Sequence, residues 1–250
     1  MKIIIGNWKL NHTKKDMLDF LGEFLPQIQN IKNIDIAIAP VATLLDAAFC
    51  KIQGKNLFLA AQNVFYEDFG AFTGEYSCKN LLDFGVTYCL IGHSERRQLF
   101  HESDEDVNKK VLACLSNNIT PVICIGESFQ DRNLGKTSEI LSKQCANALK
   151  NVNSPNIIIA YEPIWAIGSG EVASEDKILD AMAIIRQNLS KIFTKEVSKK
   201  IRLLYGGSVN NQNIKDLMLK CDIDGVLVGG ASLQVASFFN MVKTMSLLGV

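Results

Sequence analysis

The sequence predicts an α/β fold in which eight parallel strands alternate with helices and close into a (β/α)8 barrel. Three observations lead to this prediction. Eight short apolar runs recur along the chain, segments of helical periodicity separate them, and the length of 250 residues is near the ~250 typical of such barrels. An open doubly wound sheet would cover such apolar strands equally well. It is less favoured because no G-x-G-x-x-G fingerprint follows the first run.

The predicted strands are short runs rich in apolar and β-branched residues, as expected for strands buried on both faces. They comprise Lys2–Gly6, Ile34–Ala39, Leu57–Ala61, Val86–Ile91, Ile119–Ile125, Ile157–Tyr161, Ile201–Tyr205 and Gly225–Val228. Their even spacing along the chain leaves room for a helix after each strand. Such β-helix-β units pair their strands in parallel through right-handed crossovers.

Start signals and apolar stripes identify four of the helices. Thr13 and Ser103 are each followed three residues later by an aspartate, which is the pattern of a capping box. Ser174 precedes two acidic residues, which are favoured in the first turn of a helix. The four stripes comprise Met17, Leu21, Phe24 and Ile28; Val107, Val111 and Leu115; Ile178, Met182, Ile185 and Leu189; and Val235, Phe238, Val242 and Met245.

Composition excludes several classes of protein. Lys+Arg and Asp+Glu both number 26, so bulk charge indicates neither a nucleic-acid nor a membrane partner. The seven cysteines are odd in number and form no C-x-x-C, which favours free thiols in a reducing compartment. No apolar stretch reaches the ~18 residues of a membrane-spanning helix, and the first apolar run is too short for a signal peptide. We expect a cytoplasmic protein in which residues 1–250 form one domain.

The three histidines offer little material for a metal site, and no metal is predicted. His12 and His101 stand beside helix starts and are expected to be exposed. His93, in contrast, follows the end of the fourth predicted strand.

Glu162 is the most informative single residue. It stands where the sixth apolar run ends, and Pro163 after it restricts its backbone to extended conformations. The following segment is apolar and contains Gly168 and Gly170, a composition suited to a loop that closes over a ligand. The sequence therefore predicts a catalytic base followed by its own lid.

Other polar groups are predicted at the same end of the barrel, where the chemistry of this fold gathers. Asn7 and Lys9 follow the first strand and, on extended backbone, would lie on one side. Glycine pairs follow the seventh and eighth strands, beside Ser208 and at Gly229-Gly230, and match a phosphate cradle. Taken singly, each group has a plain alternative. Glu162 and Lys9 could be surface charges, His93 a structural histidine, and the glycine pairs ordinary turns. Residues 95–97 could likewise be a solvated charge run.

Several motifs occur in family order and resemble those of triosephosphate isomerases over nearly the whole chain. The two most specific are Gly92-His93-Ser94-Glu95-Arg96-Arg97 and the stretch from Tyr161 to Gly170. The others are residues 6–11, 61–64, 70–75, 124–127, 205–209 and 228–233.

The resemblance implies a TIM barrel that interconverts dihydroxyacetone phosphate and glyceraldehyde 3-phosphate without metal or organic cofactor. Glu162 would be the base, and His93 a neutral electrophile. Lys9 and Asn7 would bind substrate and stabilise charge. The resemblance also implies that Ser94 and Glu95 support these groups, and that Gly168, Ser208, Gly229 and Gly230 hold the phosphate.

The resemblance further implies a homodimer. Residues 62–76 form a long predicted loop that carries Phe65, Tyr66, Phe69 and Phe72, and so many aromatic side chains are costly in solvent unless covered. In the family this loop, with Thr73 and Phe72, docks beside the partner's active site; packing on the chain's own surface is the alternative. Two other functions stay open from the residues alone. One is a different phosphate-sugar isomerase or lyase, such as a Schiff-base aldolase using Lys9, and the other is a non-catalytic scaffold.

Overall fold

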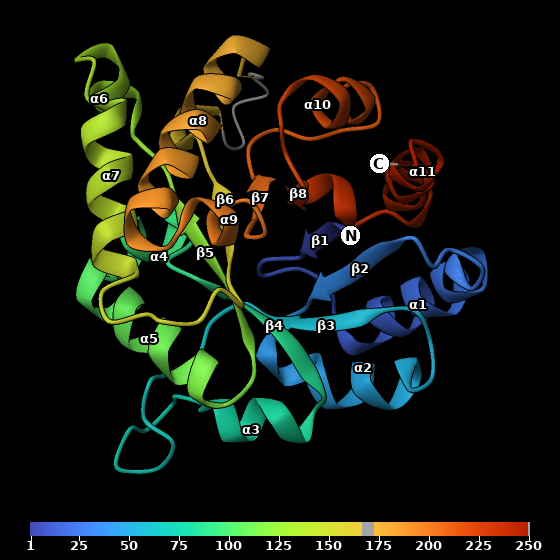
Figure 1. Ribbon diagram of the computed structural model, residues 1–250. Coiled ribbons are helices and arrows are strands. Elements are labelled where there is room, and N and C mark those ends of the chain that lie inside the picture. The colour runs from blue at the N-terminus through green and yellow to red at the C-terminus, as the bar shows by residue number, and fades with distance from the viewer. Residues whose placement is uncertain (167–172, 250) are drawn as a thin grey trace.

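Eight parallel strands form a closed barrel in the order β1 to β8 (Figure 1). The computed structural model describes residues 1–166 and 173–249. The strands are β1 Lys2–Asn7, β2 Ile34–Ala39, β3 Phe58–Ala61, β4 Val86–Ile91, β5 Thr120–Ile125, β6 Ile158–Tyr161, β7 Arg202–Tyr205 and β8 Gly225–Val228. β1 pairs with both β2 and β8, which closes the ring. The predicted fold class is confirmed, and the predicted strand ends differ by at most one residue.

The helices lie outside the strands. They are α1 Lys14–Ile28, α2 Leu45–Ile52, α3 Cys78–Asp83, α4 Ser94–Leu99, α5 Asp104–Ser116, α6 Phe129–Asn133, α7 Thr137–Ala148, α8 Glu175–Ile192, α9 Lys195–Ser198, α10 Ile214–Lys220 and α11 Val235–Leu247. Three 3-10 turns, η1 Ala42–Leu44, η2 Ile164–Ala166 and η3 Gly230–Ser232, complete the described elements. The capping boxes at Thr13 and Ser103 are confirmed. Ser174 occupies the N-cap of α8, but its side chain makes no capping hydrogen bond.

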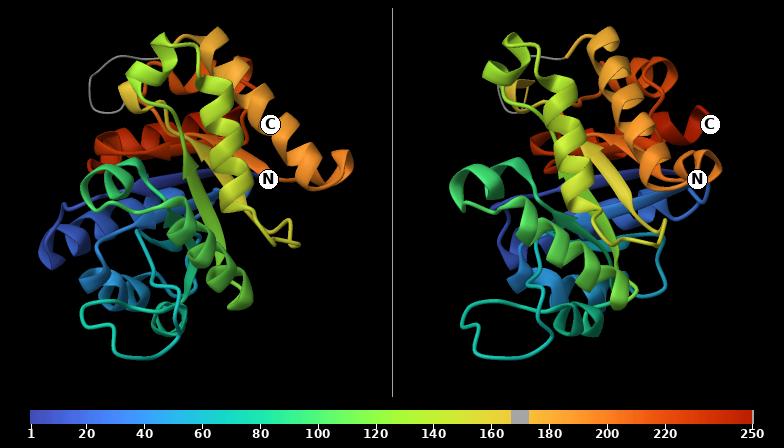
Figure 2. Two further views of the ribbon diagram at one scale, coloured as in Figure 1. Left: turned by 90° about the vertical axis from the view of Figure 1, so that its left-hand side faces the viewer. Right: turned by 60° about the vertical axis from the view of Figure 1, so that its left-hand side comes forward.

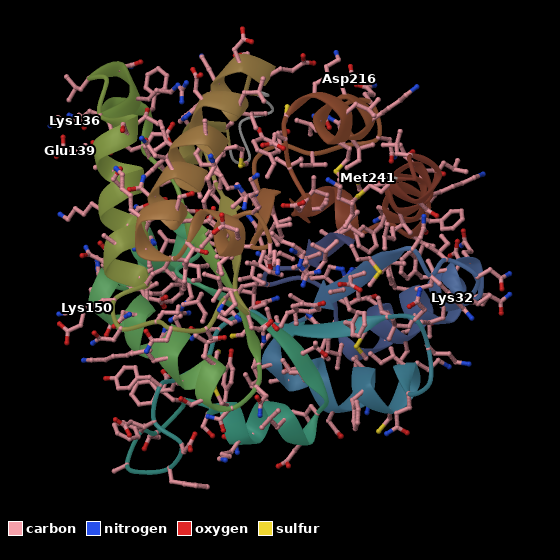
Figure 3. All side chains as sticks on the ribbon, in the orientation of Figure 1. Lys32, Lys136, Glu139, Lys150, Asp216 and Met241 are labelled. Carbon is pink, nitrogen blue, oxygen red and sulfur yellow. The ribbon has the colours of Figure 1, made fainter. Side chains whose placement is uncertain are left out.

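The core has two layers, which follow from the two-residue period of the strands. Residues such as Ile3 and Ile5 of β1 fill the inside of the barrel, while Ile4 faces outward to the helices. The predicted helical stripes supply the outer layer, and Met241 of α11 adds to it. Charged side chains labelled in Figure 3, including Lys136 and Glu139, are exposed outside this layer.

An ionic cluster fills the amino-terminal end of the barrel. Arg202 of β7 lies 2.7 Å from Asp35 of β2, and the Tyr88 hydroxyl of β4 donates to the same carboxylate at 3.2 Å. All three side chains come from early strand positions, far from the strand ends that carry the predicted site. The side chains at this end therefore bond to one another, and the predicted site lies at the opposite end, where the chemistry of this fold gathers.

One expectation about the histidines is wrong. His101 is exposed, but His12 is half-buried, with its ring centroid 4.6 Å from that of Trp8. Its positive φ of 69° turns the chain so that the imidazole packs back against the indole. The sequence pattern marks the helix start but carries no signal for this backbone turn.

Candidate active site

The carboxyl ends of β1, β4, β6, β7 and β8 share one cavity of about 310 Å³. Asn7, Lys9, His93 and Glu162 all line it. The loops after β7 and β8 complete the wall and contribute Ser208, Gly229 and Gly230. The structure thus brings together every predicted substrate-contacting residue except Gly168, which lies outside the described residues. Leu227 and Asn210 also line the cavity, although nothing in their sequence context marked them.

His93 is aimed by a glycine turn. Gly92 has φ +70°, and a Cβ there would lie 2.8 Å from Val107 and 2.9 Å from Arg97. His93 then forms the N-cap of α4, where its Nδ1 accepts a hydrogen bond from the Glu95 backbone N–H at 3.2 Å. An accepting Nδ1 carries no proton, so the neutral imidazole has its proton on Nε2. Nε2 is the nitrogen that faces Glu162.

The Glu162 carboxylate is 2% exposed and is held at the start of α4. Its Oε2 accepts the Ser94 backbone N–H at 3.0 Å, and its Oε1 lies 3.3 Å from Nε2 of His93. The positive end of a helix dipole favours a carboxylate at this position. The same charge, together with burial, raises the pKa of the Cys124 thiol well above its ordinary value, with burial the larger cause. The base candidate is therefore shielded from water and oriented.

Lys9 reaches the cavity by a different backbone path from the predicted one. Its φ is +52°, so the extended geometry expected after β1 is wrong at this residue. The Asn7 side chain accepts the Lys9 backbone N–H at 3.0 Å, and the Gln62 side-chain amide donates to the Lys9 carbonyl at 2.8 Å. These two bonds hold the left-handed turn. The Lys9 ammonium then pairs with Glu95 at 2.6 Å.

The loop after β7 is braced by two asparagines. The Asn210 side chain accepts the Asn213 backbone N–H at 3.1 Å, and the Asn213 side chain accepts the Asn210 N–H at 2.9 Å. Asn213 also donates to the carbonyl of Ser208 at 3.0 Å. The spacing of two asparagines three residues apart is the signal that could have identified this brace. Across the cavity, Ser232 donates to the Gly229 carbonyl at 2.7 Å and steadies the β8 loop.

The segment that follows Glu162 is anchored on a buried carboxylate. Glu127 is 0% exposed, and its Oε1 accepts from Trp165 at 3.2 Å, Tyr161 at 3.0 Å and Arg132 at 2.8 Å. Burial, followed by the Glu127 charge, raises the pKa of Tyr161. Burial likewise raises the pKa of Tyr205 to about 12. Both phenols therefore stay neutral at physiological pH.

The charged residues after His93 are not a solvated run. Arg96 pairs with Glu102 at 2.7 Å, and Arg97 pairs with Asp104 at 2.7 Å. Glu102 also accepts the Gly92 backbone N–H at 3.0 Å and binds Lys110 at 2.6 Å. These contacts fix the turn that presents His93. The alternative of a plain charged surface at residues 95–97 is wrong.

A second cavity of about 240 Å³ adjoins the first and shares Asn7, Lys9 and His93 with it. Exposed apolar side chains lie at its edge, with Leu10 92% and Phe100 65% exposed. The loop of residues 62–77 projects from the body of the molecule (Figure 2), and Gln62, Asn63 and Tyr76 near its two ends line this cavity. Thr73 and Phe72 lie on this loop; Phe72 packs on Phe65 at 4.5 Å between ring centroids and is 41% exposed.

Within the described ranges, no three His, Cys, Asp or Glu side chains are arranged to hold a metal ion. Of the helices in residues 1–166 and 173–249, none is long and apolar enough to cross a membrane. All seven cysteines fall within these ranges and are free thiols; six of them are buried, while Cys50 is exposed.

Comparison with known proteins identifies the family. The sequence profile described as triosephosphate isomerase matches residues 2–245. The chain belongs to the triosephosphate isomerase family. The triosephosphate isomerase of Citrifermentans bemidjiense is 46% identical over 244 residues, covering 96% of this chain and 97% of that protein. The one from Thermodesulfovibrio yellowstonii is 45% identical over 243 residues, covering 97% and 98%.

The fold agrees with this family. The crystal structure of triosephosphate isomerase from Bartonella henselae matches with a TM-score of 0.89 and 34% identity, and covers 98% of both chains. The predicted family and fold are confirmed, and with them the prediction that the chain is an isomerase. Membership of this family favours the isomerase over the two alternatives, a Schiff-base aldolase and a non-catalytic scaffold.

Proposed function

We propose that this member of the family interconverts dihydroxyacetone phosphate and D-glyceraldehyde 3-phosphate through an enediolate, in glycolysis and gluconeogenesis. Glu162 removes a proton from the carbon next to the substrate carbonyl and returns it to the neighbouring carbon. Burial at 2% exposure supports this role, since it keeps water away from the proton during its transfer. The Ser94 N–H at 3.0 Å keeps one oxygen in place and leaves the other for the substrate.

His93 acts on the substrate oxygens. With Nδ1 accepting from the Glu95 backbone, Nε2–H is the donor that faces the cavity. A donor fixed beforehand stabilises the charge that develops on oxygen as the enediolate forms. Lys9 adds a positive charge on the same side, and the Asn7 amide lines the cavity beside it.

The phosphate group binds at the loops after β7 and β8, with Ser208, Gly229 and Gly230 as the backbone donors. Glycines at 229 and 230 are consistent with this, because a phosphate can approach backbone that carries no side chain. Gly168 is proposed to complete the site from the segment after Trp165. The ammonium of Lys9 compensates part of the phosphate charge, and Gly229 would have its Cβ 3.7 Å from Lys9.

The observation that carries this proposal is the 3.3 Å approach of Glu162 and His93 on the wall of a cavity whose other side is the two glycine loops. The test is a coupled assay with glyceraldehyde 3-phosphate on Glu162→Gln, beside the surface control Glu139→Gln on α7. We expect kcat to fall by ~10²–10⁴ in Glu162→Gln, the usual worth of a positioned base. Unchanged kcat in Glu162→Gln would overturn the assignment.

A homodimer is part of the proposal. The second cavity, with exposed Leu10 and Phe100 at its edge, suits an apolar partner surface, and the projecting loop offers one in Phe72 and Phe69. In a two-fold dimer each loop can enter the other chain's cavity, so one pair of surfaces satisfies both subunits. Thr73 beside Phe72 would then lie close to Lys9 and His93 of the other subunit. The seven free thiols support a reducing, cytoplasmic location.

A further inference from the structure

The side chain of Gln144 on α7 holds both backbone groups of Gly126, the residue after β5. The Gly126 N–H donates to Oε1 at 2.8 Å, and Nε2 donates to the Gly126 carbonyl at 3.2 Å. A side-chain amide has the same donor and acceptor as a peptide group. Gln144 therefore binds Gly126 as a neighbouring strand would.

Gly126 lies directly against the backbone of Glu162. A Cβ on Gly126 would lie 1.7 Å from the Glu162 carbonyl oxygen, so no other residue fits without displacing it. On either side of this contact, the Glu162 N–H donates to the Ile125 backbone carbonyl at 2.7 Å, and the Ile164 N–H donates to the Glu127 backbone carbonyl at 3.2 Å. Residues 125–127 thus contact and hydrogen-bond the backbone of the proposed base and of the residues that follow it.

The strand geometry explains why a side chain is needed here. Along a β-strand the backbone groups of successive residues point to opposite sides. The carbonyls of Ile125 and Glu127 accept from Glu162 and Ile164, which follow β6, whereas the N–H and C=O of Gly126 face Gln144 on α7. The pairing of β4 with β5 ends at Ile91 and Ile123, and the chain then turns away through Gly92. Because the described pairing with β4 does not reach Gly126, Gln144 supplies the partner for its backbone groups.

We propose that Gln144 is a positioning residue for Glu162, acting through the Gly126 peptide groups; this rests on the proposed role of Glu162 as base. Without the amide, the Gly126 N–H and C=O lose their partners, and the segment shifts to find others. Glu162 and the Glu127 anchor of Trp165 move with it. The phosphate loops after β7 and β8 make no contact with Gln144 in the hydrogen bonds of the described residues, and they stay in place.

The first test is Gln144→Met, which keeps length and shape but removes both hydrogen bonds. Since a displacement of about 1 Å can cost ~10²-fold in rate, we expect kcat to fall roughly 10- to 100-fold. KM and the inhibition constant of inorganic phosphate should change less than about twofold, because phosphate binding is separate. The matched control is Asn188→Leu on α8. It removes an amide that donates at 3.0 Å to Ser142, which lies on α7 as Gln144 does but does not line the cavity.

The second test is Gln144→Glu, which separates positioning from general loosening. Its carboxylate can still accept from the Gly126 N–H but has no proton for the Gly126 carbonyl. Protonation restores that donor. The ratio of its kcat to that of the wild type should therefore rise as pH falls, while the corresponding ratio for Gln144→Met stays level.

Three outcomes overturn the inference. They are a folded Gln144→Met with kcat within about twofold of wild type, a rise in KM and in the phosphate inhibition constant that matches the fall in kcat, or a level pH ratio for Gln144→Glu. The pH ratio of Gln144→Glu tests the inference even if Gln144→Met does not fold. Glu162→Gln is measured in parallel: if it keeps full activity, the proposed function fails, and if it alone is inactive, only the role of Gln144 fails.

Discussion

Nε2 of His93 and Oε1 of Glu162 lie 3.3 Å apart, yet they do not form a well-directed hydrogen bond. Oε1 is buried and has no hydrogen-bond partner among the described residues. The two groups that the proposed chemistry requires are thus adjacent, and both residues line the cavity. Their other atoms, Nδ1 of His93 and Oε2 of Glu162, are bound by consecutive backbone N–H groups at the start of α4. One helix terminus therefore orients both side chains.

This arrangement predicts the tautomer of His93. Because Nδ1 accepts the Glu95 N–H at 3.2 Å, the neutral ring carries its proton on Nε2. Nitrogen-15 spectra of the imidazole should show an unprotonated Nδ1 and a protonated Nε2. His101, which is exposed, serves as the internal reference. A protonated Nδ1 in the neutral ring would contradict the proposed role of Nε2 as donor to the substrate.

The brace of the β7 loop predicts a defect in phosphate binding. Asn213→Asp keeps an oxygen for the Asn210 N–H but sets another against the Ser208 carbonyl, where the amide donated at 3.0 Å. We expect KM and the inhibition constant of inorganic phosphate to rise by roughly tenfold, the effect of about 1.4 kcal/mol. kcat at saturation should hold within a few fold.

Asn211→Asp is the matched control for charge, since Asn211 is exposed and contacts only Ser237, at 3.5 Å, in the hydrogen bonds described. It adds the same negative charge two residues away but leaves the brace intact. Equal loss of phosphate affinity in both variants would show that charge alone, rather than the Ser208 contact, sets the affinity.

The sequence predicted the barrel well because the strand signal is local. Eight apolar runs and their turn residues suffice to place the ends of the strands, and the topology then gathers Asn7, His93 and Glu162 at one end. What it did not predict depends on contacts between distant segments. The grip of Gln144 on Gly126, and the convergence of Trp165 and Arg132 on Glu127, join residues whose proximity no periodicity encodes.

The position of Lys9 on the cavity wall was predicted correctly, but its backbone conformation was not. Two-residue alternation put it on the side of Asn7, but its backbone is left-handed and is held by Gln62 from the end of β3. A lysine at positive φ is strained, and only the surrounding hydrogen bonds keep it there. Such strain is a property of the assembled fold, so a local pattern cannot reveal it.

The proposed dimer predicts that Phe72→Asp dissociates it. The substitution puts a charge on the projecting loop where the partner's apolar cavity would receive it, and an unpaired buried charge opposes association. Sedimentation should give a monomer with reduced activity at concentrations where the wild type is dimeric. Phe129→Asp is the control, since Phe129 on α6 is 61% exposed and lies outside the loop. A fully active monomeric wild type would contradict the dimer.

The network behind His93 predicts how stability depends on pH. Burial raises the pKa of Glu102, but the larger combined effect of Lys110 and Arg96 lowers it below its ordinary value of 4.5. A carboxyl whose folded pKa is lowered stabilises the protein above the unfolded pKa, and that stability is lost as pH falls through the folded pKa. Glu102→Gln should remove this dependence. It should also cost on the order of 3 kcal/mol near neutral pH, because Lys110 and Arg96 lose the charge that compensates them.

Urea unfolding at several pH values measures this effect. Between about pH 5 and pH 3, the unfolding free energy of the wild type should fall more steeply than that of Glu102→Gln. Glu105→Gln on α5 is the control, since its partner Lys109 lies 2.8 Å away on an exposed face and such pairs contribute little. Because Glu102 also accepts the Gly92 N–H, kcat of Glu102→Gln should fall with its stability. Parallel unfolding curves for Glu102→Gln and the wild type would mean that Glu102 does not carry the acid sensitivity of the fold.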